Sequence, residues 1–97
     1  MTLWKEKEIQ LSWGKCSLRY DMIVNNLYNS HGSIIGEAYG VRVSLCDAAD
    51  NRPIESREIT NITLFPTEAE RLLSLLAKGQ VTPYALEDVV SEYIGQA

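Results

Sequence analysis

CSLRYDMIVNNLYNSHGSIIGEAYGVRVSLC, residues 16–46, decides the fold, because it holds two runs of alternating side chains around one turn. Every second residue is apolar through most of the first run, 16–28, and again from residue 39 onward in the second run, 34–46. Successive side chains of a strand point to opposite faces of a sheet, so each run is typical of a strand with one buried face. Residues 29–33, NSHGS, are turn formers. The stretch therefore predicts an antiparallel hairpin.

The parity of the apolar positions restricts the register of this hairpin. The apolar row is even-numbered in the first strand and odd-numbered in the second, so the numbers of facing residues must add up to an odd value. We expect a sum of 61, which places Tyr20 opposite Val41 and Leu18 opposite Val43. A slip of one residue would turn one of the two apolar rows toward water.

The segments on either side of the hairpin extend the sheet. Residues 1–15 are either an N-terminal arm or an extra strand, in which Ile9 and Leu11 alternate with Gln10. Residues 54–62, IESREITNI, predict a weaker strand after a second turn, and their irregular alternation indicates an edge strand with a bulge. The expected sheet is an antiparallel meander of three to four strands.

Two amphipathic helices are expected after the sheet. TEAE at residues 67–70 matches a capping box and precedes a Leu-rich run of helical period, which predicts a helix near 67–78. Thr82 as N-cap and Pro83 at the first helical position predict a second helix near 83–94. Each helix has one apolar stripe and the sheet has one apolar face, so we expect an α+β fold in which a helical hairpin packs on one face of the meander.

The apolar faces of the two layers define the predicted core and the domain. With 97 residues the chain fits one domain, and residues 16–97 are expected to form a single α+β domain. By the strand parity, Cys16 points to the core and Cys46 to the opposite face, so no disulfide is expected. The predicted core residues are Leu18, Tyr20, Met22, Val41, Val43, Leu72, Leu76, Leu86, Val89, Val90 and Tyr93.

The charge of the chain argues against two classes of partner. Acidic residues outnumber basic ones by 13 to 9, the net charge is −4, and the basic residues are scattered singly. Nucleic-acid binding needs clustered Lys and Arg, and surface binding to membranes needs a basic amphipathic helix, so neither is expected. No run reaches the roughly 18 apolar residues of a membrane span, and residues 1–15 lack the apolar segment of a signal peptide. A soluble cytoplasmic protein is the expectation.

No catalytic residue is predicted, and the chain is not expected to be an enzyme. His31 lies in the predicted turn beside Ser30 and Ser33, without the orienting acid and oxyanion donors that nucleophilic catalysis needs. A turn histidine is the simpler interpretation.

No metal and no cofactor are predicted either. Cys16 and Cys46 are isolated, and the spacing of a metal site is missing. Gly36 and Gly40 lie within a strand pattern and open no helix, so they do not form a phosphate loop. They mark a bulge or a close approach of two backbones instead.

Two hypotheses of function remain from the residues alone. Glu87, Asp88 and Glu92 lie on the polar face of the last predicted helix, where they form either a solvated acidic face or a partner-binding patch. The first hypothesis is a non-enzymatic protein–protein interaction or regulatory adaptor domain that uses either this acidic helix face or the free sheet edge. The identity of its protein partner is open, and homodimerisation through the edge strand at 54–62 is the association that we expect. The alternative is a small-molecule-binding or enzymatic domain with a pocket between the sheet and the helices.

Three segments carry a resemblance to a known family. AYGVRVSL, REITNIT and VTPYALEDVV, residues 38–45, 57–63 and 81–90, together resemble a family of short, uncharacterised bacterial proteins. In that family a strand with a YGI-type triplet precedes a Leu-rich helix and a closing V-x-P-x-x-L-x-D-V-V helix. The resemblance covers residues 16–95 and implies a domain of unknown function, without an activity or a site.

Overall fold

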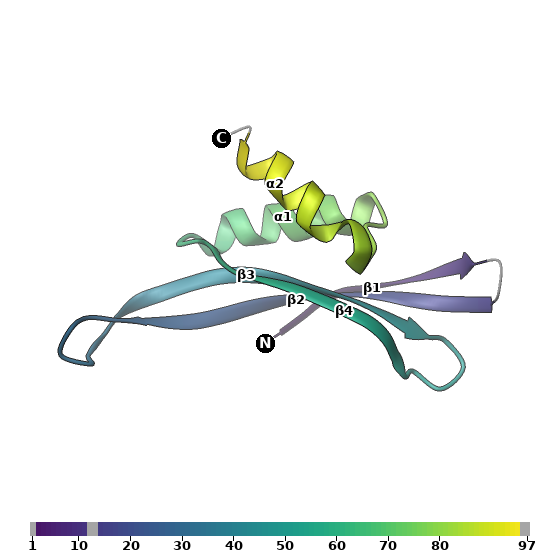
Figure 1. The fold of residues 1–97 in the computed structure, drawn as a ribbon, viewed down its shortest axis with the longest axis horizontal. Coiled ribbons are helices and arrows are strands. Elements are labelled where there is room, and N and C mark those ends of the chain that lie inside the picture. Colours follow the sequence, from purple (N-terminus) through teal and green to yellow (C-terminus); the bar gives the residue numbers. More distant parts are fainter. Residues whose placement is uncertain (1, 12–13, 96–97) are drawn as a thin grey trace.

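The computed structural model describes the backbone of residues 2–11 and the backbone and side chains of residues 14–95. Its elements, in chain order, are strands β1 (Thr2–Leu11), β2 (Gly14–Tyr28), β3 (Ile34–Asp47) and β4 (Pro53–Thr63), helix α1 (Pro66–Lys78), the single 3-10 turn η1 (Pro83–Ala85) and helix α2 (Leu86–Gly95). Figure 1 shows a long sheet with both helices on one of its faces. The predicted α+β fold, an antiparallel meander followed by two helices, is confirmed.

The four strands form one sheet in the order β1-β2-β3-β4, and each pairs antiparallel with its neighbour. The stretch that the sequence left open between an arm and a strand supplies β1, which runs along β2 as far as Met22. On the other side, β4 runs along β3 as far as Tyr39. Beyond these two points the hairpin of β2 and β3 continues alone, as the projecting end at the left of Figure 1.

The register of the hairpin has the predicted parity but not the predicted partners. Tyr20 lies opposite Val43 and Leu18 opposite Leu45, so the numbers of facing residues add up to 63 instead of 61. The cause is a bulge near the turn, where Tyr28 pairs with Ile34 and the register then shifts by one residue. With the five-residue turn alone, the numbers of facing residues would add up to an even value, as 28 and 34 do, and the two apolar rows would lie on opposite faces of the sheet. The extra residue in β3 therefore restores the apolar rows to the same face.

The turn that closes the hairpin is held by one side chain. The carboxamide oxygen of Asn29 accepts hydrogen bonds from the backbone N–H groups of His31 and Ser33, at 2.9 and 3.0 Å. An Asn side chain that bonds its own backbone two residues on is a common turn device. This local bonding fixes a turn length that the apolar pattern alone does not reveal.

The core lies between the helix-covered face of the sheet and the apolar stripes of the two helices. Of the predicted core residues, Met22, Val89 and Tyr93 are only partly buried, because they lie at the margin of the helical layer. The others are at most 2% exposed, namely Leu18, Tyr20, Val41, Val43, Leu72, Leu76, Leu86 and Val90. Cys16 belongs to this core, whereas Cys46 is buried elsewhere, and the two do not form a disulfide with each other.

The first helix does not begin with the predicted capping box. Phe65 is the N-cap, Pro66 follows at the start of the helix, and no side chain makes a capping bond, so Thr67 lies inside the helix. Proline favours the first helical position because its φ is already helical and it lacks the N–H that would go unpaired there. Glu70, the glutamate of the predicted capping box, is exposed.

The second helix occupies the predicted residues but starts differently. Thr82 is the N-cap and Pro83 the first helical residue, as expected, yet the first turn is the 3-10 segment η1 and Thr82 makes no side-chain capping bond. The α-helical part, α2, follows from Leu86. Among the described residues, no helix is long and apolar enough to span a membrane.

Candidate functional site

The predicted acidic patch lies on the surface of α2. Glu87, Asp88 and Glu92 are all exposed, and Glu87 and Asp88 belong to the first turn of the helix. None of the three lines the cavities described below. The structure therefore places these three exposed carboxylates together on one helix.

A cavity of about 180 Å³ lies between the sheet and the helical hairpin. The sheet contributes Tyr39, Val41 and Ile62, and the helices contribute Ala69 and Leu72 of α1, among other residues. Most of this lining is apolar. The hypothesis of a small-molecule-binding or enzymatic domain expects a pocket between the sheet and the helices, and this cavity lies there. The sequence did not identify any lining residue of the cavity as a site residue.

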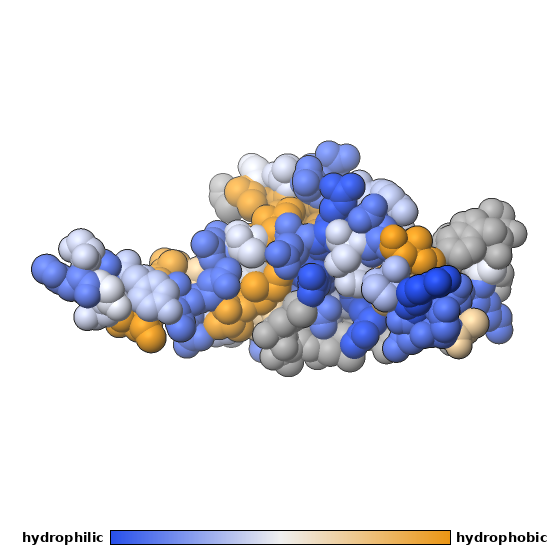
Figure 2. All heavy atoms as spheres, turned by 60° about the horizontal axis from the view of Figure 1, so that its bottom comes forward, coloured by the Kyte–Doolittle hydropathy of each residue, from blue (hydrophilic) through white to orange (hydrophobic). Residues whose placement is uncertain are grey.

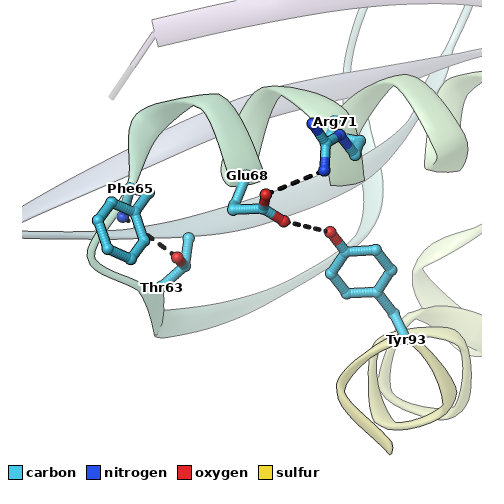
Figure 3. Close-up of polar contacts among 5 residues, drawn as sticks. All are labelled: Thr63, Phe65, Glu68, Arg71 and Tyr93. Atoms are coloured by element: carbon cyan, nitrogen blue, oxygen red, sulfur yellow. Dashed lines mark hydrogen bonds and ion pairs between the residues drawn. The ribbon is translucent and has the colours of Figure 1, made fainter. Parts of the chain in front are cut away.

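The polar rim of this cavity is a bridge between the two helices. Tyr93 of α2 donates a hydrogen bond of 2.9 Å from its hydroxyl to Oε2 of Glu68 on α1 (Figure 3). The other carboxylate oxygen, Oε1, accepts a hydrogen bond of 3.0 Å from Nη1 of Arg71. The hydrogen bond to Glu68 is the main cause that raises the pKa of Tyr93, since it stabilises the protonated phenol. The bridge therefore keeps Tyr93 neutral and oriented toward the carboxylate.

A second hollow, of about 320 Å³, lies on the helix-free face of the sheet. Arg19, Asp21 and Arg42 line it on adjacent strands, with Asp21 directly opposite Arg42 in the register. Burial raises the pKa of Asp21, and the two arginines partly oppose this shift. Arg42 also pairs with Glu58 at 3.7 Å. The charged residues described in the lining of the hollow are two arginines and one aspartate.

The outer edge of β4 is open along its length within the described part of the chain, because β3 lies on one side only. Glu55 and Arg57 lie opposite Leu45 and Val43 of β3, so their side chains emerge on the helix-covered side of the sheet. Their charged groups approach each other to 3.7 Å and remain partly exposed. Proteins usually protect such an edge, since its unpaired backbone groups can pair with another strand.

The projecting end of the β2–β3 hairpin carries exposed apolar side chains. Val24, Tyr28, Ile34 and Ile35 are each between 37% and 65% exposed. Figure 2 shows orange, hydrophobic atoms on this end among blue, hydrophilic ones. Apolar side chains gathered on a projecting element are typical of a surface that contacts another macromolecule.

Several residues considered from the sequence take no part in a site. His31 is exposed in the hairpin turn, and no group of three metal-ligating side chains occurs among the described residues. Burial, with a smaller effect from Asp47, raises the pKa of Cys16, so its thiol stays protonated in the core. Gly40, by contrast, lines the cavity between the sheet and the helices, and it marks a close approach, as predicted, because a Cβ at this position would collide with the carbonyl oxygen of Ile59.

The contact between Glu68 and Tyr93 is the feature that sequence reasoning missed. The expected capping box pairs Thr67 with Glu70 and gives Glu68 no role of its own, and Tyr93 is expected in the core. The two residues are 25 positions apart, and their contact depends on how the two helices cross. One feature of the sequence points to this contact. Tyr93 is the last residue of an apolar helical stripe, so its hydroxyl lies at the margin of the core, where it needs a hydrogen-bond partner.

These features define a small α+β domain with a four-stranded antiparallel sheet, a helical hairpin on one face, and an open strand edge. The chain belongs to the family described as "Family of unknown function (DUF6514)", whose model matches residues 1–96. The match thus includes the N-terminal segment, which the resemblance had left out. No curated protein and no solved structure matched in the other two comparisons.

Proposed function

We propose that this chain is a non-enzymatic protein–protein interaction domain with an adaptor or regulatory role, which forms a homodimer through the outer edge of β4. The observation that carries the proposal is the open edge of Pro53–Thr63 with its pattern of charges. The exposed apolar side chains of the projecting hairpin support the same class of function, since they too are typical of a contact surface.

The charges of β4 favour one self-pairing. In a dimer whose two-fold axis crosses the sheet at Ser56, two antiparallel β4 strands place Glu55 of one protomer opposite Arg57 of the other, twice. An axis at Glu55, Arg57 or Glu58 would instead place that charge opposite its own copy. Opposite charges across a strand pair stabilise it by about 0.2–1 kcal/mol each, and like charges destabilise it. Charge therefore selects the Ser56-centred register.

The position of the two-fold axis determines how the two protomers are arranged in this dimer. A two-fold axis perpendicular to the sheet keeps both helical hairpins on the same side, because facing residues of an antiparallel pair point to the same face. The two four-stranded sheets would then continue as one sheet of eight strands. Backbone hydrogen bonds would supply most of the affinity, and the charges mainly the register.

Sedimentation equilibrium across micromolar concentrations tests the proposal, with the wild-type chain expected to approach twice its monomer mass. Arg57→Glu places a carboxylate opposite Glu55 of the partner at two points, so it should raise the dimer dissociation constant about tenfold or more. Arg52→Glu is the matched control, because Arg52 is 75% exposed in the turn before β4 and the change in net charge is the same.

Two results would contradict the proposal. A wild-type chain that stays monomeric up to several hundred micromolar would remove self-pairing altogether. A dimer that Arg57→Glu and Arg52→Glu weaken equally would show that net charge, and not the register of β4, controls association. Unchanged circular dichroism of both variants excludes unfolding as the cause of any loss.

A further inference from the structure

We propose that the cavity between the sheet and the helical hairpin is a binding site for a small ring-bearing molecule with a hydrogen-bond donor, an aryl-alkyl amine being the best match. This inference is independent of the dimer, because none of the cavity residues is Glu55, Ser56 or Arg57. It rests on the size of the cavity, on its apolar lining and on the chemistry of its rim.

The size and lining of the cavity fit one ring. Its volume is about 180 Å³, and an apolar cavity of roughly 150 Å³ in another protein accommodates benzene. Tyr39 and Tyr93 offer aromatic surface, and Val41, Ile62 and Leu72 offer aliphatic surface. A ring with a short side chain can therefore be buried here while the end of that side chain reaches the rim.

The rim offers acceptors for a donor. The hydroxyl of Tyr93 uses its proton to bond Glu68, so its oxygen can only accept a further hydrogen bond from a ligand. The carboxylate of Glu68 accepts one bond on each oxygen, whereas a carboxylate has about four acceptor positions. Both groups thus prefer a ligand that donates.

The charge at the rim discriminates between an amine and an acid. Glu68 lines the cavity and its side chain is 38% exposed, so a ligand at the rim meets the carboxylate directly. Arg71 pairs with Glu68 but does not line the cavity, and its own side chain is 67% exposed to solvent. An ammonium group is therefore attracted to Glu68, and a ligand carboxylate is repelled by it.

Titrations by nuclear magnetic resonance with two matched probes test the site. 2-Phenylethylamine should shift the signals of Ala69, Leu72 and Tyr93 saturably at millimolar concentrations, and phenylacetate, of similar size, should bind at least tenfold more weakly. Glu68→Gln should weaken the binding of 2-phenylethylamine about tenfold, since it removes a charge-assisted contact. Glu70→Gln, on the exposed side of the same helix, should leave the affinity unchanged.

Three outcomes would overturn the inference. In the first, 2-phenylethylamine causes no saturable shifts of the cavity signals. In the second, 2-phenylethylamine and phenylacetate bind with equal affinity. In the third, Glu68→Gln and Glu70→Gln weaken the binding of 2-phenylethylamine equally. The last outcome would mean that the amine only senses the net negative charge of the protein. Tyr93→Phe gives a second check, because it keeps the ring of the lining and removes one acceptor, and it should weaken amine binding without affecting benzene.

Discussion

The hydroxyl of Tyr20 on β2 donates a hydrogen bond of 3.1 Å to the carbonyl oxygen of Val81, 61 residues further along the chain. Val81 belongs to the short connection between α1 and η1, so this bond joins the centre of the sheet to the turn of the helical hairpin. Tyr20 is fully buried, and its hydroxyl would be costly to bury without a partner. One side chain thereby specifies where the helical layer sits on the sheet.

The burial of Tyr20 makes stability depend on pH in the alkaline range. Burial raises the pKa of Tyr20 to about 12, whereas an unfolded tyrosine titrates near pH 10. The stabilising contribution is complete below about pH 10 and is lost as pH rises toward about 12, because the native chain retains a proton that the unfolded chain releases. We expect Tyr20 to account for a loss of about 1–3 kcal/mol across this range.

Denaturant unfolding of Tyr20→Phe at several pH values measures this effect. Near neutral pH the variant should be less stable by about 1 kcal/mol, since the carbonyl of Val81 loses its donor. The gap to the wild-type chain should close as pH rises above 10. Tyr84→Phe is the control, because Tyr84 is 64% exposed and its variant should follow the wild-type pH dependence. A gap for Tyr20→Phe that stays constant with pH would refute this role.

The apolar stripe of α2 should contribute strongly to stability. Leu86 and Val90 are at most 2% exposed, so truncation of either to alanine should lower the free energy of unfolding by about 2–4 kcal/mol through lost burial and a residual cavity. Ile94→Ala, at a residue 50% exposed near the end of the same helix, should cost much less. Equal denaturant midpoints for the wild-type chain and both core variants would contradict this packing.

The close approach of β3 and β4 at the register shift between Tyr39 and Val41 requires a glycine at position 40. Gly40→Ala would place a methyl group against the backbone at Ile59 and Thr60, which cannot move without disturbing β4. We expect a destabilisation of about 1–3 kcal/mol, as for other overpacked positions. Gly36→Ala is the comparison, because a Cβ there meets nothing within 4 Å. Thermal unfolding of the two variants distinguishes a steric cost from a general effect of replacing glycine.

The charge distribution predicts no measurable binding to duplex DNA or RNA at physiological salt. The net charge is −4, and the arginines lining the helix-free hollow lie beside acidic partners, as Arg42 does beside Glu58. Polyanion binding would require a basic surface. A gel-shift titration with mixed-sequence DNA checks this expectation, and salt-sensitive retardation of the DNA would overturn it.

The sequence predicts the fold well where one periodic pattern spans a whole element. Strict alternation around Tyr20 and Val43 defines two strands and their buried faces, and Leu72 and Leu76 define a helical stripe. The pattern does not specify the register, because a sum of 61 and a sum of 63 both keep the apolar rows together. That choice depends on a bulge beside Ile34, where local turn bonding decides.

The candidate site is less predictable than the fold. Glu68 lies between Thr67 and Glu70, the two residues of the expected capping box, so the sequence gives it no role of its own, yet it accepts the hydrogen bond from Tyr93. The cavity itself follows from side-chain volumes at the layer boundary, which no periodicity encodes. The sequence does predict an edge strand at 54–62, but its irregular alternation does not show that Glu55 and Arg57 emerge on the helix-covered side of that strand.

The central claim, that β4 pairs with a second copy about Ser56, is tested most directly by mixing two charge variants. Glu55→Arg alone and Arg57→Glu alone should each weaken the homodimer, because like charges then face each other twice. Mixed in equal amounts, the two variants should form a heterodimer in which every facing pair is again opposite in charge, and sedimentation equilibrium should recover a dimer about as stable as that of the wild-type chain. A mixture that remains as weakly associated as the separate variants would contradict the claim.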